Sequence, residues 1–305
     1  MLLSDFGIDE RYFAHTCVYK EPEKLTEHLD LTLEYYKKIV ESKNLNFVID
    51  SLIKKIDSKN FELIKEMFIN TIYLHDLGKK NPIFQKVKMK NPLFNSCEDD
   101  GDSKHSHIGA LEFIEYYNSH FNKKIKNNDV DFYRLNFILY NFSYHISKHH
   151  GKLDNMNDYP KDKKENKEKH NDFKCILKDI DDYVTKDDFD FFILNKLLFS
   201  LVISSDYFAT TAYMTDKIFD NFGIFKKEDK LLFESLYSDF IKSFGEPQGI
   251  NNLRNEISKT AVEELSKNIN KSIFYLEAPT GSGKTLTSIA LASKLLNTNE
   301  NLNKI

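Results

Sequence analysis

The chain contains no tryptophan and is poor in cysteine, glycine and proline, with three, ten and six residues among 305. Its cysteines, Cys17, Cys97 and Cys175, are odd in number, lie far apart and form no CxxC pair. This pattern disfavours a disulfide scaffold and a cysteine-rich zinc site. The N-terminal segment MLLSDFGIDER carries acidic residues where a secretion signal needs basic ones. The expected compartment is therefore a reducing cytoplasm.

An excess of positive charge is also missing. The 43 basic and 47 acidic side chains give a formal net charge of -4, so any contact with nucleic acid must come from local patches. The longest apolar stretch, FFILNKLLFSLVISS, is interrupted by Asn195 and Lys196. We expect it to be a buried helix, too short and too polar to span a bilayer, and no membrane partner is predicted.

Periodic apolar positions dominate the first part of the chain, and few helix-breaking residues interrupt them. Residues 1–245 are therefore predicted to form one mainly all-α domain, a multi-helix bundle. The expected helices cover residues 24–42, 60–77, 105–119, 133–150, 187–213 and 229–243. Residues 91–104 are expected to form an acidic loop, and residues 154–171 a charged, solvated insertion.

The character of the sequence changes near Gly245. A linker, GEPQGINN, is followed by a helix-like segment at 255–269, a β-like run SIFYLEA at 272–278, a glycine loop and a helix-like segment at 286–297. The order strand, loop, helix is typical of the start of a RecA-like α/β nucleotide-binding domain. A complete sheet needs several more strands, so residues 246–305 are predicted to hold only the start of a second domain.

Adjacent His75 and Asp76 are the most informative feature of the first domain. His75 continues the apolar face of a helical stretch that includes Ile64, Phe68 and Ile72. A polar pair on such a face costs free energy unless it has a partner. A metal ion is one such partner, because imidazole suits transition metals and a carboxylate can bridge two ions. A lone pair of this kind is more often a core histidine beside a surface aspartate, so the interpretation depends on the other segments.

Comparable side chains occur on four further apolar-faced segments. They are His28 in LTEHLDLTLEYY, His105 and His107 in SKHSHIGALEFIEYY, His145, His149 and His150 in RLNFILYNFSYHISKHHGK, and Asp206 in LVISSDYFATTAY. Each alone has a structural interpretation, as a core histidine, a histidine pair at a helix C-terminus or a locally bonded aspartate. Together they exceed one tetrahedral zinc site and suit two octahedral ions bridged by a carboxylate.

These pieces resemble a known family. HDLGK at 75–79, followed by PIFQ at 82–85, resembles the signature of HD-domain metal phosphohydrolases. The fuller set is similar to the nuclease domain of the CRISPR-associated nuclease-helicase of type I systems, over most of residues 1–245. Its other members are EHL at 27–29, HSHIGA at 105–110, KHHG at 148–151 and SSDYFATT at 204–211. One departure is the lysine in KHHG, where relatives often have glycine.

The resemblance implies a site with two divalent metal ions. One ion would be held by His28, His75, Asp76 and Asp206, and the second by Asp76, His105, His149 and His150, with Asp76 bridging. Lys79 would stabilise charge near the scissile phosphate. His107 is a rival to His105, while His15 and His145 have no family role and are expected to be structural. The metal can be Mn, Fe, Co, Ni or Zn, because mixed histidine and carboxylate ligation accepts each of them.

The glycine loop APTGSGKT, at 278–285, fits the Walker A spacing except that Ala278 replaces the first glycine. Backbone N–H groups of such a loop hold phosphates, the lysine reaches the terminal phosphates and the threonine holds Mg²⁺. The expected ATP-binding residues are Gly281, Gly283, Lys284 and Thr285. The alanine form resembles motif I of superfamily 2 helicases. ATP with Mg²⁺ is expected only in a protein with the whole domain, so neither ATPase nor helicase activity is predicted for this chain.

The sequence therefore favours a metal-dependent HD nuclease that cuts single-stranded DNA in CRISPR interference, using a water activated by two metal ions. Its expected partners are single-stranded DNA and a CRISPR RNA-guided surveillance complex. Two alternatives remain open, a phosphohydrolase that acts on nucleotides and a metal-stabilised docking module without catalysis. The charged insertion and the attached helicase start favour a polymeric substrate. Seven matching ligands together with Lys79 favour catalysis.

Overall fold

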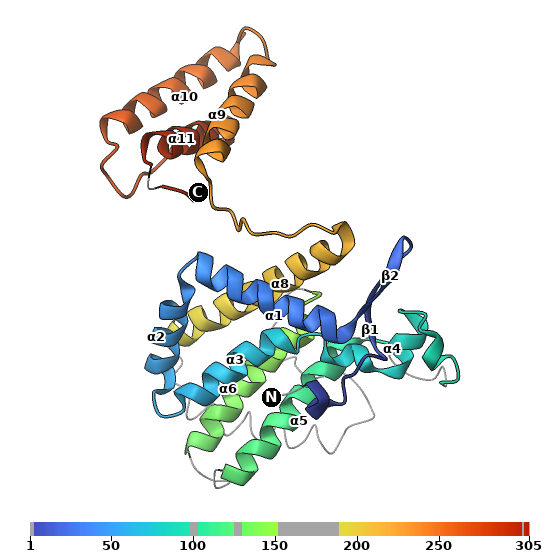
Figure 1. Cartoon of the computed structure of the whole chain (residues 1–305). Helices are drawn as coiled ribbons and strands as arrows, with labels where there is room; N and C mark the ends of the chain where they lie inside the picture. Colours follow the sequence, from blue (N-terminus) through green and yellow to red (C-terminus); the bar gives the residue numbers. More distant parts are fainter. Residues whose placement is uncertain (1–2, 98–102, 125–129, 152–188, 301, 305) are drawn as a thin grey trace. The chain divides into compact units, whose positions relative to one another are not determined.

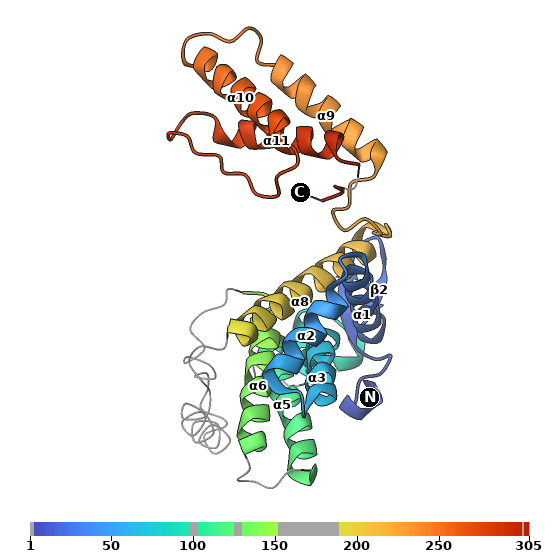
Figure 2. The same cartoon turned by 90° about the vertical axis from the view of Figure 1, so that its left-hand side faces the viewer.

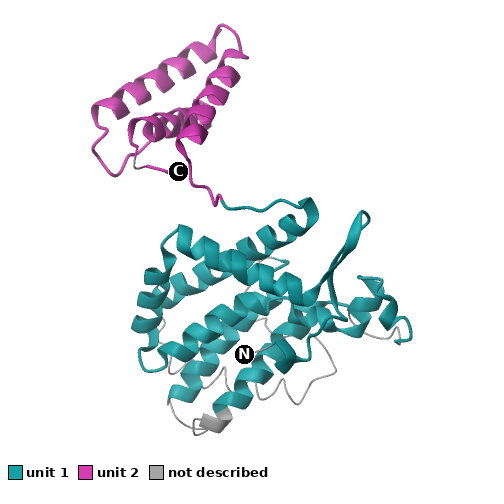
Figure 3. Cartoon of the chain, in the orientation of Figure 1, with its two compact units in different colours: residues 1–220 teal, residues 221–305 magenta. Residues whose placement is uncertain are grey.

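The computed structural model describes residues 3–97, 103–124, 130–151, 189–300 and 302–304. Two compact units divide the chain, residues 1–220 and residues 221–305 (Figure 3). The change of character predicted near Gly245 therefore falls inside the second unit. The reason is that helix α9 (Lys227–Lys242), which the sequence places in the first domain, packs against a helix that follows it. The charged insertion predicted at 154–171 lies outside the described residues.

The first unit is a bundle of helices, as predicted (Figure 1). Helix α3 contacts four others, and α1 and α8 lie side by side in both views of the chain (Figures 1 and 2). The helices are α1 (Leu25–Ser42), α2 (Leu45–Asp57), α3 (Phe61–Tyr73), α5 (His105–Lys124), α6 (Val130–Lys148) and α8 (Phe189–Thr215). Five of them match expected helices, whereas α2 was not among those predicted.

Helix α3 shows how the apolar pattern builds the core. Ile64, Phe68 and Ile72 are fully buried, and the Phe68 ring meets the Phe142 ring of α6 edge to face at 6.0 Å. The helix ends at Tyr73, earlier than predicted, and the chain continues as a turn into a short 3-10 helix, η2 (Leu77–Lys80). Because this turn follows the buried face of α3, it carries His75 and Asp76 into the core.

Two glycines bring the turn against helix α5. A Cβ atom added to Gly78 would lie 1.9 Å from the carbonyl oxygen of His105 and 2.7 Å from the backbone nitrogen of Gly109. One added to Gly109 would lie 2.8 Å from the backbone nitrogen of Gly78. Contacts this short exclude any side chain at Gly78. The glycines of HDLGK and HSHIGA therefore lie together because η2 and α5 pack backbone to backbone.

Among the described residues, the first unit also contains a two-stranded hairpin and a short helix. Strand β1 (Phe13–Cys17) pairs antiparallel with β2 (Lys20–Lys24), and neither was predicted, because both are short and β2 is polar and contains Pro22. Helix α4 (Pro82–Val87) is capped at its N-terminus by Asn81, whose side chain accepts a hydrogen bond from the backbone nitrogen of Ile83. The remaining elements are the 3-10 helices η1 (Leu3–Phe6) and η3 (Pro92–Phe94), the latter within the predicted acidic loop.

The described helices of the second unit are α9, α10 (Ile250–Lys267) and α11 (Lys284–Thr298). Their buried residues include Leu265, Ala290 and Leu296. The strand predicted at 272–278 is wrong for this chain, because that segment forms no regular structure. A strand needs a hydrogen-bonded neighbour, and among the described residues of this unit no other strand occurs. The aromatic ring of Tyr275 in this segment is consequently 92% exposed.

Helix α8 is long and apolar enough to cross a membrane when only length and composition are considered, the one such helix among the described residues. The helix has 27 residues and is longer than the apolar stretch FFILNKLLFSLVISS, on which the prediction was based. By length and composition, the prediction that this segment is too short to span a membrane is therefore wrong. A long helix in the centre of a bundle passes the same test. Helix α8 packs against α1, α2, α3 and α6, and 33% of its most apolar stretch is buried within the fold.

The contact between η2 and α5 leads to a test of stability. Gly78→Ala should destabilise the protein by about 3 kcal/mol or more, at the upper end of overpacking costs, because the obstructing atoms belong to the backbone of α5. Thermal unfolding would measure the change. Gly151→Ala is the control, since among the described residues an added Cβ there comes within 4 Å only of the Lys148 carbonyl oxygen, at 3.8 Å. Equal melting temperatures for the two variants would contradict the close packing.

Candidate metal centre

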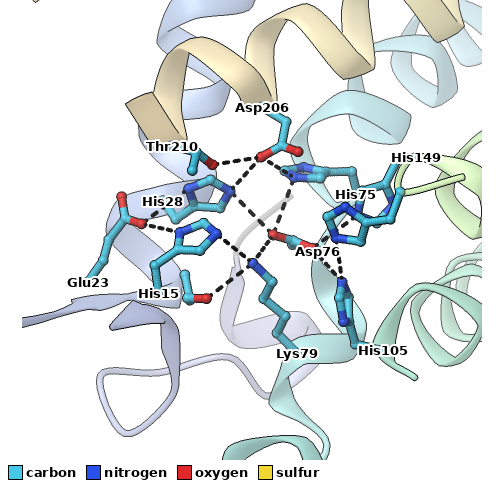
Figure 4. A network of polar contacts seen from close by, with 12 residues as sticks. His15, Glu23, His28, His75, Asp76, Lys79, His105, His149, Asp206 and Thr210 are labelled. Atoms are coloured by element: carbon cyan, nitrogen blue, oxygen red, sulfur yellow. Dashed lines mark hydrogen bonds and ion pairs between the residues drawn. The ribbon is translucent and has the colours of Figure 1, made fainter. Parts of the chain in front are cut away.

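The residues predicted as ligands converge on the carboxylate of Asp76, in the turn that follows α3 (Figure 4). They come from separate elements of the bundle. His28 lies on α1, His105 begins α5, His149 and His150 directly follow α6, and Asp206 lies on α8, while His75 precedes Asp76 in the chain. They form two groups that share Asp76, and within each group one ligand atom per residue lies within 4.8 Å of the others.

The first group lies at the Oδ2 atom of Asp76. This oxygen is 3.3 Å from Nε2 of His28 and 3.4 Å from Nε2 of His75. The Oδ1 atom of Asp206 is 3.3 Å and 3.5 Å from the same two nitrogens. His28, His75 and Asp76 are fully buried, and the side chain of Asp206 is 16% exposed. Two imidazoles and two carboxylates thus face one point.

The second group lies at the other carboxylate oxygen. Oδ1 of Asp76 is 3.1 Å from Nε2 of His105 and 3.3 Å from Nε2 of His149. Nε2 of His150 lies 3.1 Å from Nε2 of His105. Of the two rival histidines at the start of α5, His105 belongs to this group and His107 belongs to neither group. The two oxygens of one carboxylate are therefore divided between two sets of ligands.

The donor atoms fit divalent metal ions. Both carboxylate oxygens of Asp76 and the Nε2 atoms of His28, His75 and His149 are buried without a hydrogen bond, although Oδ2 of Asp76 has an ion-pair contact with Lys79. Buried polar atoms without partners are costly. Two ligands about 2.1 Å from one ion stand roughly 3.0–3.4 Å apart, close to the separations observed here. Nitrogen and oxygen donors in this mixture suit transition metals.

Backbone carbonyls fix how two of the imidazole rings face the centre. Nδ1 of His75 donates to the carbonyl oxygen of Ile72 at 3.0 Å, and Nδ1 of His149 donates to that of Ile146 at 2.6 Å. A carbonyl only accepts, so the proton lies on Nδ1. Nε2 then faces Asp76 and is the nitrogen that a metal ion would bind once any proton on it is lost, which is the arrangement that metal-binding histidines require.

Lys79 lies against the same carboxylate and is 3% exposed. Its Nζ is 2.7 Å from Oδ2 of Asp76, 3.1 Å from the carbonyl oxygen of Ala14 and 3.0 Å from Nε2 of His15. An ammonium group has three N–H donors, and here three acceptors face them. Lys79 is therefore placed to neutralise Asp76, while its predicted action on a phosphate remains a prediction.

Glu23, which lies on β2 and is 4% exposed, was not among the predicted site residues. Its Oε2 is 2.6 Å from Nδ1 of His15 and 3.4 Å from Nδ1 of His28. Glu23 pairs with His15 across the hairpin, and this register cannot be predicted from the pattern of polar residues. His145 belongs to neither metal group; it contacts Asn195 at 3.0 Å, and burial lowers its pKa to about 4.

Buried charges shift the pKa values in the cluster. Burial lowers the pKa of His28, but the carboxylates of Asp206 and Asp76 outweigh it and raise the pKa to about 10. The same two carboxylates raise the pKa of His75 to about 9 against the effect of burial. Burial raises the pKa of Asp76, yet Lys79 and His75 hold it well below its usual range. Without metal, protons on the histidines therefore balance the carboxylates.

Metal binding should consequently release protons. At neutral pH the metal-free protein holds protons on His28 and His75, whose pKa values are raised to about 10 and about 9, and a ligand nitrogen must lose its proton. Affinity for a divalent ion should rise as pH increases towards those pKa values. Calorimetric titration with Zn²⁺ in buffers of different ionisation enthalpy counts the protons. His28→Gln should release fewer, and a wild-type titration without proton release would contradict the assignment.

A second candidate site lies in the other unit, at the glycine loop. Gly281 and Gly283 have φ angles of +83° and +85°, which favour glycine, and Lys284 begins α11 directly after them. The ammonium group of Lys284 donates to the carbonyl oxygens of Ala278 and Pro279 at 2.8 Å and 3.0 Å. Arg254 of α10 donates to the carbonyl oxygen of Gly281 at 2.8 Å. The loop and helix take the order predicted, while the preceding strand does not form.

Comparison with known proteins places the first unit in a family. No curated protein and no solved structure matches the chain. Residues 20–209 match the family described as "Cas3, HD domain", which is more than half of the chain and includes every predicted metal ligand. That family implies a metal-dependent nuclease of CRISPR systems that acts on nucleic acid. Together with the converging histidines and aspartates, the match shows that this chain belongs to the Cas3 HD-domain family.

Proposed function

We propose that this chain hydrolyses phosphodiester bonds of single-stranded DNA in the cytoplasm, as the nuclease of a CRISPR interference system. The observation that carries this proposal is the divided carboxylate of Asp76, whose oxygens face two separate sets of ligands. Two ions at such a site lower the pKa of a bound water and stabilise charge on both the attacking and the leaving oxygen. The family match supports a nucleic acid substrate.

The protein's own residues would perform three tasks in this reaction. Asp76 would join the two ligand sets, and its burial would hold the distance between them constant. His75 and His149 would present unprotonated Nε2 atoms, because carbonyls hold their other nitrogens. Lys79 would supply positive charge beside Asp76, so that the centre stays balanced when an anionic phosphate arrives.

Exposure indicates the side from which a substrate would approach. The side chains of His28, His75 and Asp76 are fully buried, whereas those of His105 and Asp206 are 12% and 16% exposed. His150 is exposed as well. A phosphodiester would therefore reach the centre past His105, His150 and Asp206. An extended single strand fits such a partly open site better than a duplex, whose phosphates are held on a wide rigid cylinder.

We further propose that the second unit is the start of a superfamily 2 helicase domain, with ATP and Mg²⁺ at Gly281, Gly283, Lys284 and Thr285 when the whole domain is present. The positive φ angles of the glycines and the position of Lys284 at the start of α11 support this. So do the exposed Ile273 and Tyr275, which are 71% and 92% exposed and would be covered by neighbouring strands. Attachment to a strand-separating domain favours a DNA polymer over free nucleotides as substrate.

The bridging carboxylate gives the first functional prediction. Asp76→Asn should reduce cleavage of circular single-stranded DNA by at least about a hundredfold, the loss that removal of a single electrostatic group causes in other hydrolases. The variant should also lose at least one bound metal ion, because the amide is neutral and a poorer ligand. Metal analysis and a cleavage time course on one preparation measure both effects. Asp220→Asn, on an exposed residue, is the control.

Full activity and full metal content in Asp76→Asn would contradict the proposed centre. The three functional hypotheses also separate in these assays. A nucleotide phosphohydrolase would act on dNTPs and leave circular single-stranded DNA intact. A docking module would bind metal and cleave neither substrate.

The second unit gives another prediction. Lys284→Ala should leave cleavage of single-stranded DNA unchanged within about twofold, since the glycine loop lies outside the residues that match the family. Cleavage should need no ATP, and blunt duplex DNA should survive under the same conditions. Lys294→Ala, exposed on the same helix, controls for loss of a surface charge. A requirement for ATP, or hydrolysis of ATP that depends on Lys284, would show that the second unit acts in this reaction.

A further inference from the structure

We propose that His15 and Glu23, on the two strands of the hairpin, are positioning residues of the metal centre. Glu23 fixes the proton of His28, and His15 fixes the ammonium group of Lys79. The proposal rests on the metal centre assigned above and extends it to an outer layer of side chains. Neither residue belongs to the two ligand groups around Asp76.

The buried ligand histidines follow one rule with one exception. His75 and His149 each direct Nδ1 to a carbonyl oxygen of their own turn and Nε2 to Asp76. His28 directs Nε2 to Asp76 in the same way, but the acceptor that faces its Nδ1 is the carboxylate of Glu23, at 3.4 Å. A carboxylate only accepts, so the proton of His28 belongs on Nδ1 and the lone pair on Nε2. The contact lacks hydrogen-bond geometry, so Glu23 favours the proton on Nδ1 of His28 through its negative charge, whereas backbone carbonyls hydrogen-bond the other two rings.

Oε2 of Glu23 also orients His15, which in turn contacts Lys79. Oε2 of Glu23 lies 2.6 Å from Nδ1 of His15, which therefore carries the proton. Nε2 of His15 is left as an acceptor, and it faces Nζ of Lys79 at 3.0 Å. The contacts form a closed ring, from Asp76 to Lys79, His15, Glu23 and His28 and back to Asp76 (Figure 4).

The hairpin is held firmly enough to orient these groups. Gln85, in the PIFQ segment, is fully buried and bonds both backbone groups of Phe13, accepting from its nitrogen at 2.9 Å and donating to its oxygen at 2.8 Å. The Gln85 amide also donates to the carbonyl oxygen of Lys79 at 2.7 Å. One side chain therefore ties strand β1 to the turn that carries Lys79, and His15 lies two residues further along that strand.

A third metal site is the competing explanation, because donor atoms of His15, Glu23 and His28 also lie within 4.8 Å of one another. The contacts argue against it. Nδ1 of His15 is already paired with Glu23 at 2.6 Å, and the other nitrogen faces a lysine ammonium at 3.0 Å. A cation at this point would be repelled by Lys79. The outer groups around a metal ligand are commonly of this kind, a carboxylate bonded to the far nitrogen of a histidine.

The test measures Zn²⁺ affinity of the full chain by competition with a chelator. Glu23→Ala should weaken binding by about 10- to 100-fold, the range for lost outer-layer partners, and Glu23→Gln by a smaller factor, because the amide oxygen can still accept. Glu21→Ala, at an exposed position of the same strand, should bind as the wild type does. His15→Gln should bind more tightly than His15→Ala, since an amide can donate to Glu23 and accept from Lys79.

A second readout does not depend on affinity. In ¹H–¹⁵N spectra of the Zn²⁺-loaded wild type, the His28 ring should carry its proton on Nδ1, and this signal should shift in both Glu23 variants while those of His75 and His149 stay in place. If Glu23→Ala fails to fold, the comparison of Glu23→Gln with Glu21→Ala carries the test. Unchanged affinity and an unchanged His28 signal in Glu23→Gln would overturn the proposal and leave the metal centre standing. A wild type that binds no Zn²⁺ would overturn both.

Discussion

The rest of the first unit depends on keeping one carboxylate, that of Asp76, fully buried and shared between two sets of ligands. Removing a carboxylate from water costs several kcal/mol unless opposite charge and hydrogen bonds compensate. Here Lys79 compensates at 2.7 Å, and imidazoles approach both oxygens. Several helices must therefore end or begin at the same point, which explains why the motifs are scattered along the sequence yet converge in space. The glycines at positions 78 and 109 allow the backbones to come close enough.

The sequence predicted those parts of the fold and the site that depend on apolar periodicity and on motifs. The helices that carry His28, His105 and Asp206, and the helix that ends just before His149, were all predicted from their apolar positions. Helix α2 was not predicted, although the spacing of Ile49, Ile53 and Ile56 is typical of a helix. The sequence therefore contained the signal for this helix. The hairpin could not be predicted in this way, because each strand is only five residues long and β2 is polar. Its contribution to the site depends on the cross-strand register.

The second unit shows the limit of a motif that stands without its surroundings. The loop of Gly281 and Gly283 and the helix that begins at Lys284 form as local structure, because glycine conformation and helix propensity act over a few residues. The strand before them does not form, because a strand is defined by hydrogen bonds to a neighbour that this part of the chain lacks. The local sequence therefore predicted the local geometry of the loop and the helix. Residues 272–278, which would need neighbouring strands, have no regular structure and are mostly exposed.

The central claim is that one buried carboxylate joins two metal ions. Anomalous diffraction from crystals of the full chain grown with Mn²⁺ tests it most directly, because the signal locates the metal without reference to activity. The account predicts two peaks, one beside Oδ2 of Asp76 among His28, His75 and Asp206, and one beside Oδ1 among His105, His149 and His150. The peaks should lie roughly 3.5–4 Å apart. A single peak, or peaks that do not flank Asp76, would contradict it.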